Sequence, residues 1–225
     1  MRKPLAILAA ALALTGCSLL PAGRDERPAP PPRTSAPVTV ATPSFENRQC
    51  LAKLGANGSR FAPLPDRYFG AGCSQLGTVE ISGLRGDASG FEVTNLGPVR
   101  CPTADALAAW ARYGVDRAAR QILGSPLARI ETMGSYSCRN VAGTGRLSAH
   151  ATAQAIDVGG FVLEDGRRIA VLGAWNGGTE AERRFLRVVH ASACKRFGTV
   201  LGPDYNAAHR DHLHVEKGGR AGFCR

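Results

Sequence analysis

The sequence predicts an α+β domain in which helices pack on a small antiparallel sheet, held together by about three disulfides. Paired segments that alternate apolar and polar residues flank tight-turn signals, which is typical of β-hairpins. Two longer segments repeat apolar residues every three or four positions, which is typical of helices with one packed face. Six cysteines follow the N-terminal region of the chain. Antiparallel hairpins combined with a few packed helices indicate the α+β class.

Two hairpins are predicted from these alternating segments. The first joins residues 79–81 and 91–93 across a glycine-containing turn. The second joins residues 156–163 and 168–172 across Asp165-Gly166, a strong tight-turn signal. Further extended segments are expected at residues 128–136, 199–201 and 213–216.

Two helices are predicted from their boundary signals and apolar periodicity. The first has Thr103 as its expected N-cap and stops at Gly124. The second begins at a capping box formed by Thr179 and Glu182 and is expected to run to Phe197. Each helix presents one apolar face, so both are expected to pack on the sheet.

The N-terminal residues predict export and lipidation. Residues 1–16 have a short positive start and an apolar core that is too short to span a bilayer, as in a signal peptide. They lead into Cys17 through Leu-Thr-Gly, which resembles the lipobox of bacterial lipoproteins and implies a lipid on Cys17. The alternative is an ordinary signal peptide that contains a cysteine. Ser18 after the cysteine favours the outer membrane over the inner membrane.

The proline-rich composition that follows predicts a tether. Residues 17–46 contain Pro, Ala, Arg, Thr and Ser and include a run of prolines at 30–32, which favours an extended, unpacked chain. The folded domain is then expected over residues 47–225. The expected location is the cell envelope, as a periplasmic lipoprotein.

The formal net charge of +10 and the pI of about 9.8 indicate a basic surface. The basic residues are scattered along the chain, so we expect a diffuse positive field and no nucleic-acid site. An exported basic protein meets anionic lipid and cell-wall polymers. The expected partners are therefore peptidoglycan and, through the lipid anchor, the membrane, with the protein acting as a monomer.

The six cysteines after Cys17 predict three disulfides, because the compartment outside the cytoplasm is oxidising. Fifteen pairings are possible, and the sequence does not select one. A cysteine zinc site is the rival interpretation, but the sequence contains no CxxC pair. The working expectation is the sequential pairing Cys50–Cys73, Cys101–Cys138 and Cys194–Cys224.

Four of the five histidines lie in two short segments. In the second segment His212 and His214 would share a face if the chain is a strand there, because strand side chains repeat every two residues. The first segment offers His150 and, seven residues later, Asp157. One carboxylate and two imidazoles leave a fourth zinc position free for water, as in catalytic zinc sites.

The first segment resembles the SxHxxGxAxD motif of the D-Ala-D-Ala-type zinc peptidases. Ser148, His150, Ala155 and Asp157 match the motif, whereas Ala153 stands where the motif has glycine. Alanine is small but has less backbone freedom than glycine.

The second segment matches the DxxH and HxH patterns of the wider superfamily, through Asp211, His212 and His214. Together with the segment 134–139, these motifs resemble the bacterial extensin-like C-terminal domain proteins over roughly residues 50–224. The resemblance implies a fold related to the hedgehog-like and D-Ala-D-Ala-peptidase-like zinc folds.

The resemblance implies a Zn²⁺ site and assigns a role to each residue. The implied ligands are His150, Asp157 and His214. Asp211 takes the place of the general base, and His212 takes the place of a histidine that assists catalysis in the lysostaphin-like group. Asp211 has the simpler alternative role of orienting an imidazole.

Three further residues have implied roles around this site. Arg139 resembles the arginine that stabilises the oxyanion, although an arginine beside Cys138 can also be structural. Ser148 would brace the site or cap a turn. His209 is either a partner of the ligands or a loop residue.

The implied function is a zinc-dependent peptidase that cleaves peptide stems or cross-links of peptidoglycan. One alternative is an inactive module that retains zinc and binds peptidoglycan or an envelope protein. Another is a disulfide-stapled structural protein whose histidines bind adventitious metal. The residues do not indicate which peptide bond is cut.

Overall fold

The structure is a computed structural model that describes residues 43–218 and 222–225. The expected signal peptide, the lipidation at Cys17 and nearly all of the expected tether lie outside these residues. The first helix begins at Phe45, two residues before the expected start of the domain. Within the described ranges, no helix has the length and apolar character needed to cross a membrane.

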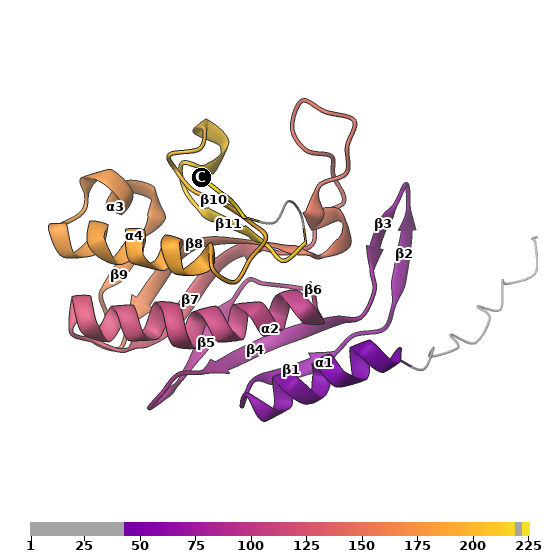
Figure 1. Cartoon of the computed structure of the whole chain (residues 1–225), viewed down its shortest axis with the longest axis horizontal. Helices are drawn as coiled ribbons and strands as arrows, with labels where there is room; N and C mark the ends of the chain where they lie inside the picture. The colour runs from indigo at the N-terminus through magenta and orange to yellow at the C-terminus, as the bar shows by residue number, and fades with distance from the viewer. Residues whose placement is uncertain (1–42, 219–221) are drawn as a thin grey trace, which may run out of the picture. The chain divides into compact units, whose positions relative to one another are not determined.

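A large mixed sheet forms the centre of the fold (Figure 1). Its strands follow the order β1-β4-β5-β7-β8-β11-β10-β12, with β6 paired to β4 and β9 paired to β8. The strands are β1 (Arg60–Pro63), β4 (Thr78–Arg85), β5 (Gly90–Thr94), β6 (Val99–Arg100), β7 (Leu127–Gly134), β8 (Ala155–Leu163), β9 (Arg168–Ala170), β10 (Thr199–Leu201), β11 (Leu213–Glu216) and β12 (Phe223–Cys224). A separate antiparallel pair consists of β2 (Arg67–Gly70) and β3 (Cys73–Gln75).

The expectation of a small antiparallel sheet was wrong in two respects. The main sheet has ten strands among the described residues, and the pairs β5–β7 and β10–β12 are parallel. Parallel strands require a crossover connection, and the first predicted helix provides it between β5 and β7. The α+β class is confirmed, and hairpins form at both expected turns. In the first, residues 83–85 of β4 pair with β5 in place of residues 79–81, and in the second the strand after the turn ends at Ala170.

The helices gather on one face of the sheet in Figure 1, with α3 at the edge beside α4. They are α1 (Phe45–Ala56), α2 (Cys101–Trp110), α3 (Val171–Gly177) and α4 (Glu180–Ala193), and α2 continues through π-helical turns to Leu123. Trp110 is fully buried and donates a hydrogen bond from Nε1 to the carbonyl of Val189, 3.0 Å away, which joins α2 to α4. Its ring also packs edge-on against Phe161 of β8. The apolar core therefore lies between this helical layer and the sheet.

The helix boundaries differ from the predictions at two points. Helix α2 begins at Cys101 with Arg100 as its N-cap, because the fixed backbone of Pro102 fits the first helical turn. Thr103 is therefore no cap; it is buried inside the helix and its hydroxyl donates to the carbonyl of Gln154. Helix α4 has the predicted capping box, but it ends at Ala193, and Phe197 is a buried residue just after the turn that follows the helix.

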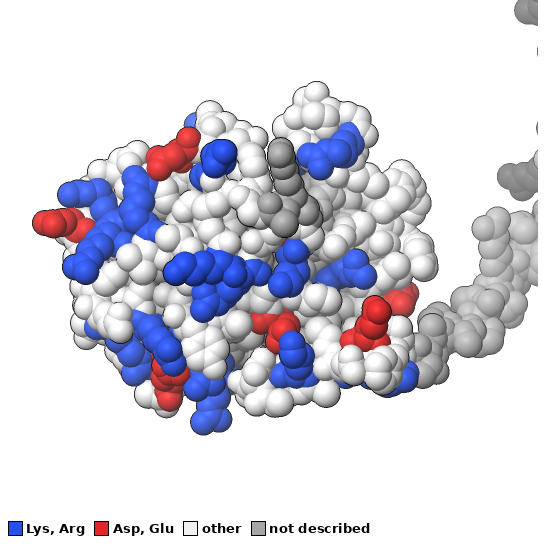
Figure 2. All heavy atoms as spheres, in the orientation of Figure 1, with Lys and Arg blue, Asp and Glu red and all other residues white. Residues whose placement is uncertain are grey.

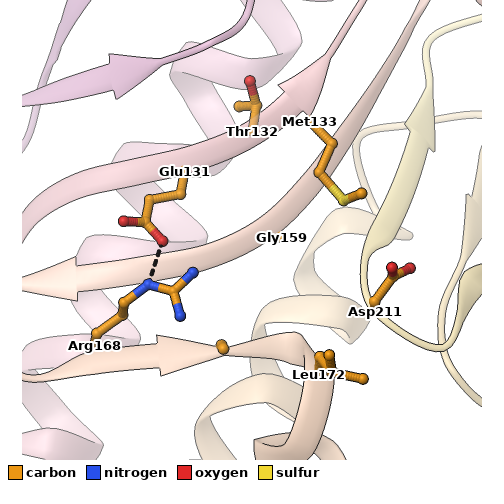
Figure 3. A pocket seen from close by; sticks show the side chains of 8 residues that line it. Glu131, Thr132, Met133, Gly159, Arg168, Leu172 and Asp211 are labelled. Carbon is orange, nitrogen blue, oxygen red and sulfur yellow. Dashed lines mark hydrogen bonds and ion pairs between the residues drawn. The ribbon is translucent and has the colours of Figure 1, made fainter.

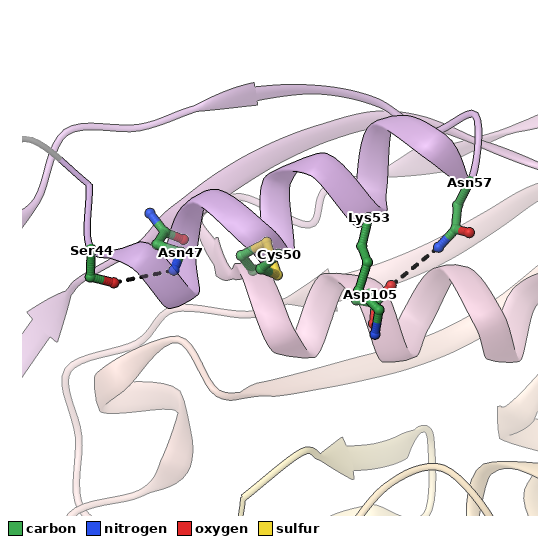
Figure 4. Close-up of a disulfide and its surroundings, with 7 residues drawn as sticks. Ser44, Asn47, Cys50, Lys53, Asn57 and Asp105 are labelled. Atoms are coloured by element: carbon green, nitrogen blue, oxygen red, sulfur yellow. Dashed lines mark hydrogen bonds and ion pairs between the residues drawn. A yellow bond between two sulfur atoms is a disulfide. The ribbon is translucent and has the colours of Figure 1, made fainter.

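All six cysteines form disulfides, as predicted, but two of the three expected pairings were wrong. Cys194–Cys224 is confirmed, whereas Cys50 pairs with Cys101 and Cys73 pairs with Cys138. The sequential pairing fails because α1 packs along α2, which brings two segments together that lie far apart in the chain (Figure 4). Asp105 of α2 reinforces this contact through Lys53 and Asn57.

Charged side chains are spread over the face shown in Figure 2. Lys and Arg cover more of this face than Asp and Glu, and both signs are interspersed over several elements. Such a distribution produces a diffuse positive field around the protein.

The disulfide connectivity can be tested by tryptic digestion of the unreduced protein followed by mass spectrometry. We expect residues 49–53 to be linked to residues 101–112, and residues 68–85 to be linked to residues 130–139, because each peptide contains one of the cysteines paired here. Reduction before digestion is the control and releases all four peptides. A species that links residues 49–53 to residues 68–85 would contradict the arrangement of α1 on α2.

Candidate metal centre

A short 3-10 helix, Ala149–Thr152, positions His150. Ser148 caps this helix, because its hydroxyl accepts a hydrogen bond from the amide of His150 at 3.3 Å. The ring nitrogen Nδ1 of His150 lies 2.6 Å from the carbonyl oxygen of Ser135. A carbonyl only accepts hydrogen bonds, so Nδ1 carries the proton and Nε2 is the nitrogen available to a metal. His150 is buried, so this orientation is enforced by its surroundings.

Ala153 ends the 3-10 helix at the position where the zinc-peptidase motif has glycine. Its φ is 54°, in the left-handed region, and its amide donates to the carbonyl of His150 at 3.1 Å. This conformation costs an alanine roughly 1–2 kcal/mol, which explains why glycine suits the position. The turn is nevertheless formed, so the departure from the motif leaves the placement of His150 intact.

Asp157 and His214 meet across two neighbouring strands. They are directly paired in the antiparallel register of β8 and β11, and Oδ1 of Asp157 lies 2.9 Å from Nδ1 of His214. Oδ2 of Asp157 lies 3.2 Å from Nε2 of His150, and the same nitrogen lies 3.2 Å from Nδ1 of His214. The structure therefore brings the three predicted ligands together in one cluster, partly or fully buried, as a group that could hold a metal ion.

These separations can be compared with the geometry of a tetrahedral zinc ion. Zinc bonds to nitrogen and oxygen are about 2.0–2.1 Å long, so two ligand atoms on one ion lie about 3.3 Å apart. The two imidazole nitrogens lie 3.2 Å apart, and each lies 2.9 or 3.2 Å from the nearer carboxylate oxygen of Asp157, Oδ1 for His214 and Oδ2 for His150. The donor set of two imidazoles and one carboxylate also fits a zinc site with a position left for water.

The pKa values of Asp157 and His214 depend on the charged groups that surround them in this cluster. Burial raises the pKa of Asp157, but hydrogen bonds with His150 and His214 outweigh it and hold that pKa far below its usual range. Burial lowers the pKa of His214, but the carboxylates of Asp157 and Glu216 outweigh it and raise that pKa to about 9. A metal bound at Nδ1 would take the place of this proton, so binding would release it.

Glu216 is a site residue that the sequence interpretation missed. Its Oε2 lies 3.7 Å from Nε2 of His214, on the side of the ring away from Asp157. Metal-binding histidines are commonly held by a carboxylate at the other ring nitrogen. The signal was present in the sequence, because residues 212, 214 and 216 recur at the two-residue period of one strand face.

His212 and Asp211 form a dyad beside the cluster. Nδ1 of His212 lies 2.8 Å from Oδ1 of Asp211, and Nε2 lies 3.5 Å from Oδ1 of Asp157. The hydrogen bond with His212 lowers the pKa of Asp211. Asp211 thus fixes the proton on Nδ1 and leaves Nε2 of His212 directed at the cluster.

His209 also lies at the site, with its ring 5.2 Å from that of His212 and 5.9 Å from that of His214. Burial and the neighbouring charges of His212 and His214 lower the pKa of His209 to about 4, so it is neutral at pH 7. Its Nδ1 is hydrogen bonded to Asn206 at 2.7 Å. His209 is therefore a neighbour of the cluster that is held by its own loop.

Arg139 is the predicted site residue with the least structural support. It is exposed, and within the described part of the chain its guanidinium makes no hydrogen bond or ion pair. Its carbonyl accepts the amide of Ser148, and its charge acts on His209. The backbone next to it is fixed by the Cys73–Cys138 disulfide. Its role in stabilising an oxyanion stays a prediction.

A second group, His190 with Cys194 and Cys224, also gathers metal-binding residue types. Its two sulfurs form a disulfide with each other, however. A thiolate is the form of cysteine that binds metal, so this group is no metal site while the disulfide is intact.

A groove of about 350 Å³ reaches Asp211, the hydrogen-bond partner of His212 (Figure 3). Asp211 belongs to its wall, and Gly159 lies two residues from Asp157 on β8, so the cluster and the groove share one strand face. The lining residues are Glu131, Thr132, Met133, Gly159, Arg168, Ala170, Leu172 and Asp211.

The raised pKa of His214 predicts a pH dependence of stability in the metal-free protein. The protonated form is favoured by folding, so its contribution is complete below the unfolded pKa of about 6.5 and is lost as the pH rises through about 9. Urea unfolding of chelator-treated protein should show a lower free energy of unfolding at pH 9.5 than at pH 6.5, by a few kcal/mol. The His214→Gln variant should lose most of this difference. An equal pH dependence in both proteins would contradict the pairing of His214 with Asp157.

Comparisons with known proteins address the identity of the chain. A search of curated proteins and a search of solved structures each found no significant match. The family described as extensin-like protein C-terminus matches residues 48–225, from within α1 to the last residue. This match covers the whole cluster, the groove and the three disulfides. The chain therefore belongs to the extensin-like C-terminus family.

Proposed function

We propose that this protein is a zinc-dependent peptidase that cleaves peptide stems or cross-links of peptidoglycan. The observation that carries the proposal is the cluster of His150, Asp157 and His214 at zinc-compatible separations, with the dyad of His212 and Asp211 beside it. Structural zinc sites use four protein ligands, whereas catalytic sites use three and leave one position open. The proposal includes a fold relationship to the D-Ala-D-Ala-type and hedgehog-like zinc proteins, which the motifs suggested.

Zinc, when bound, would lower the pKa of its water and polarise the scissile carbonyl. His150, Asp157 and His214 would hold the ion. Ser135 and Glu216 orient the two imidazoles through the ring nitrogens that face away from the cluster.

His212 is the better placed of the two candidate proton acceptors. Its Nε2 faces the cluster, whereas Asp211 engages the opposite ring nitrogen at 2.8 Å. In this arrangement His212 takes a proton from the attacking water and returns it to the leaving amine. Asp211 holds the tautomer and stabilises the imidazolium, as the carboxylate does in a catalytic triad.

The substrate class rests on the expected location and on charge. An exported, lipid-anchored protein with a net charge of +10 is attracted to the acidic polymers of the envelope. Peptidoglycan stems are peptides that carry carboxylates, so they suit both a peptidase and a positively charged protein.

The function is tested by incubating the zinc-supplied full chain with cell-wall sacculi and identifying new peptide termini by mass spectrometry. We expect new termini with the wild-type chain and a loss of about 100- to 10,000-fold in rate with His212→Ala, because a proton acceptor is removed. The zinc content of His212→Ala should equal that of the wild type. A matched control is His190→Gln, a histidine on α4 outside the cluster, which should keep its activity.

Two results would contradict the proposal. If His212→Ala keeps full activity, His212 does not transfer the proton and the proposed mechanism is wrong. Unchanged sacculi together with tight binding of stem peptides would instead support a binding module that retains the zinc site without hydrolysis.

A further inference from the structure

The groove beside the metal cluster combines apolar walls with a charged end. Met133 and Leu172 border it, and these residues are 54% and 60% exposed, although both are large and apolar. Gly159 lies between them on the floor, and Figure 3 shows the Met133 side chain reaching over this position. Exposed apolar side chains around a hollow are typical of a ligand site.

Arg168 lies at the end of the groove away from Asp211 (Figure 3). Its Nε donates to Oε2 of Glu131 at 2.6 Å, which fixes the position of the guanidinium on β9. Glu131 is also within 3.6 Å of Arg129, so its negative charge is shared between two arginines. In Figure 3 the two terminal nitrogens of Arg168 point away from Glu131, toward the groove. A guanidinium held in this way suits recognition of a carboxylate.

Gly159 keeps the groove open. A Cβ atom placed there would have its nearest contacts at 3.5 and 3.6 Å, both with the side chain of Met133. These are ordinary van der Waals distances, so a side chain would fit at this position but would fill part of the groove. Gly159 has no left-handed backbone that would explain the glycine. Gly159 is also the residue of β8 that has no partner on β7, at the register shift between Val158 and Gly160. Its lack of a side chain leaves the space above the strand open.

We propose that this groove binds the part of the substrate on one side of the scissile bond, with Arg168 holding a substrate carboxylate and Glu131 positioning Arg168. The inference rests on the proposed function, because the groove leads to the cluster through Asp211. It narrows the substrate class to peptides that carry a free carboxylate away from the bond that is cut. An amidated stem would lack the partner of Arg168.

The test measures binding by titration calorimetry, using the full chain with the His212→Ala substitution so that the probe is not consumed. The two probes are the stem tetrapeptide L-Ala–γ-D-Glu–meso-diaminopimelate–D-Ala and the same peptide with its carboxylates converted to amides. We expect the acid to bind about tenfold more tightly than the amide, because the amide cannot form the charge-assisted hydrogen bond with Arg168. Arg168→Gln should abolish this preference.

Two further variants make the result specific. Arg184→Gln, which removes an exposed arginine from α4, should retain the tenfold preference. Gly159→Val should weaken the binding of both probes, because it fills the groove, and its thermal unfolding shows whether it is folded. Equal affinity for the two probes, or a preference that survives Arg168→Gln, would overturn the inference.

The proposal about the groove and the proposal that the protein is a peptidase can fail separately, and the experiments distinguish the two failures. If new peptide termini appear from sacculi but the acid and the amide bind equally well, the peptidase proposal is supported and the carboxylate subsite is contradicted. If the acid binds more tightly than the amide only when Arg168 is present, but the wild-type chain cleaves nothing, the subsite is supported and the peptidase proposal is contradicted.

Discussion

The carboxylate of Asp157 lies within 3.5 Å of ring nitrogens from three histidines, His150, His212 and His214. These side chains come from different parts of the chain: the pairing of β8 with β11 places His214 opposite Asp157, and the 3-10 helix Ala149–Thr152 brings in His150. A carboxylate among three imidazoles stabilises positive charge there, whether that charge is a proton on an imidazole or a bound cation. Asp157 is the group that contacts all three histidines, and together with Glu216 it raises the pKa of His214.

The rest of the fold keeps the cluster in place and accessible. Helices α2 and α4 join on one face of the sheet, where Trp110 and Phe161 are buried. Asp157 and His214 alternate with the buried residues of their strands and lie on the other face, beside the groove that Leu172 of α3 also borders. The Cys73–Cys138 disulfide fixes the segment that follows Ser135, whose carbonyl orients His150. A rigid sheet face with a few polar side chains is a suitable support for a metal-dependent site.

Local patterns in the sequence predicted much of the fold and the cluster. The two-residue period placed His212 and His214 on one face, and turn residues located the hairpins, because both depend on neighbours in the chain. Contacts between distant segments could not be predicted in this way. The packing of α1 on α2 decides that Cys50 pairs with Cys101, and the parallel pairing of β5 with β7 depends on a crossover. Glu216 was within reach of the same two-residue pattern but lay outside the known motifs.

The most direct test of the account is the metal content of the purified, oxidised full chain, combined with zinc X-ray absorption spectroscopy. The account predicts one zinc per chain, bound by two imidazole nitrogens and a carboxylate oxygen at about 2.0–2.2 Å. It predicts that Asp157→Asn loses most of this zinc while its three disulfides remain intact. Zinc well below one per chain, sulfur ligands in the spectrum, or full zinc content in Asp157→Asn would contradict the central role of Asp157.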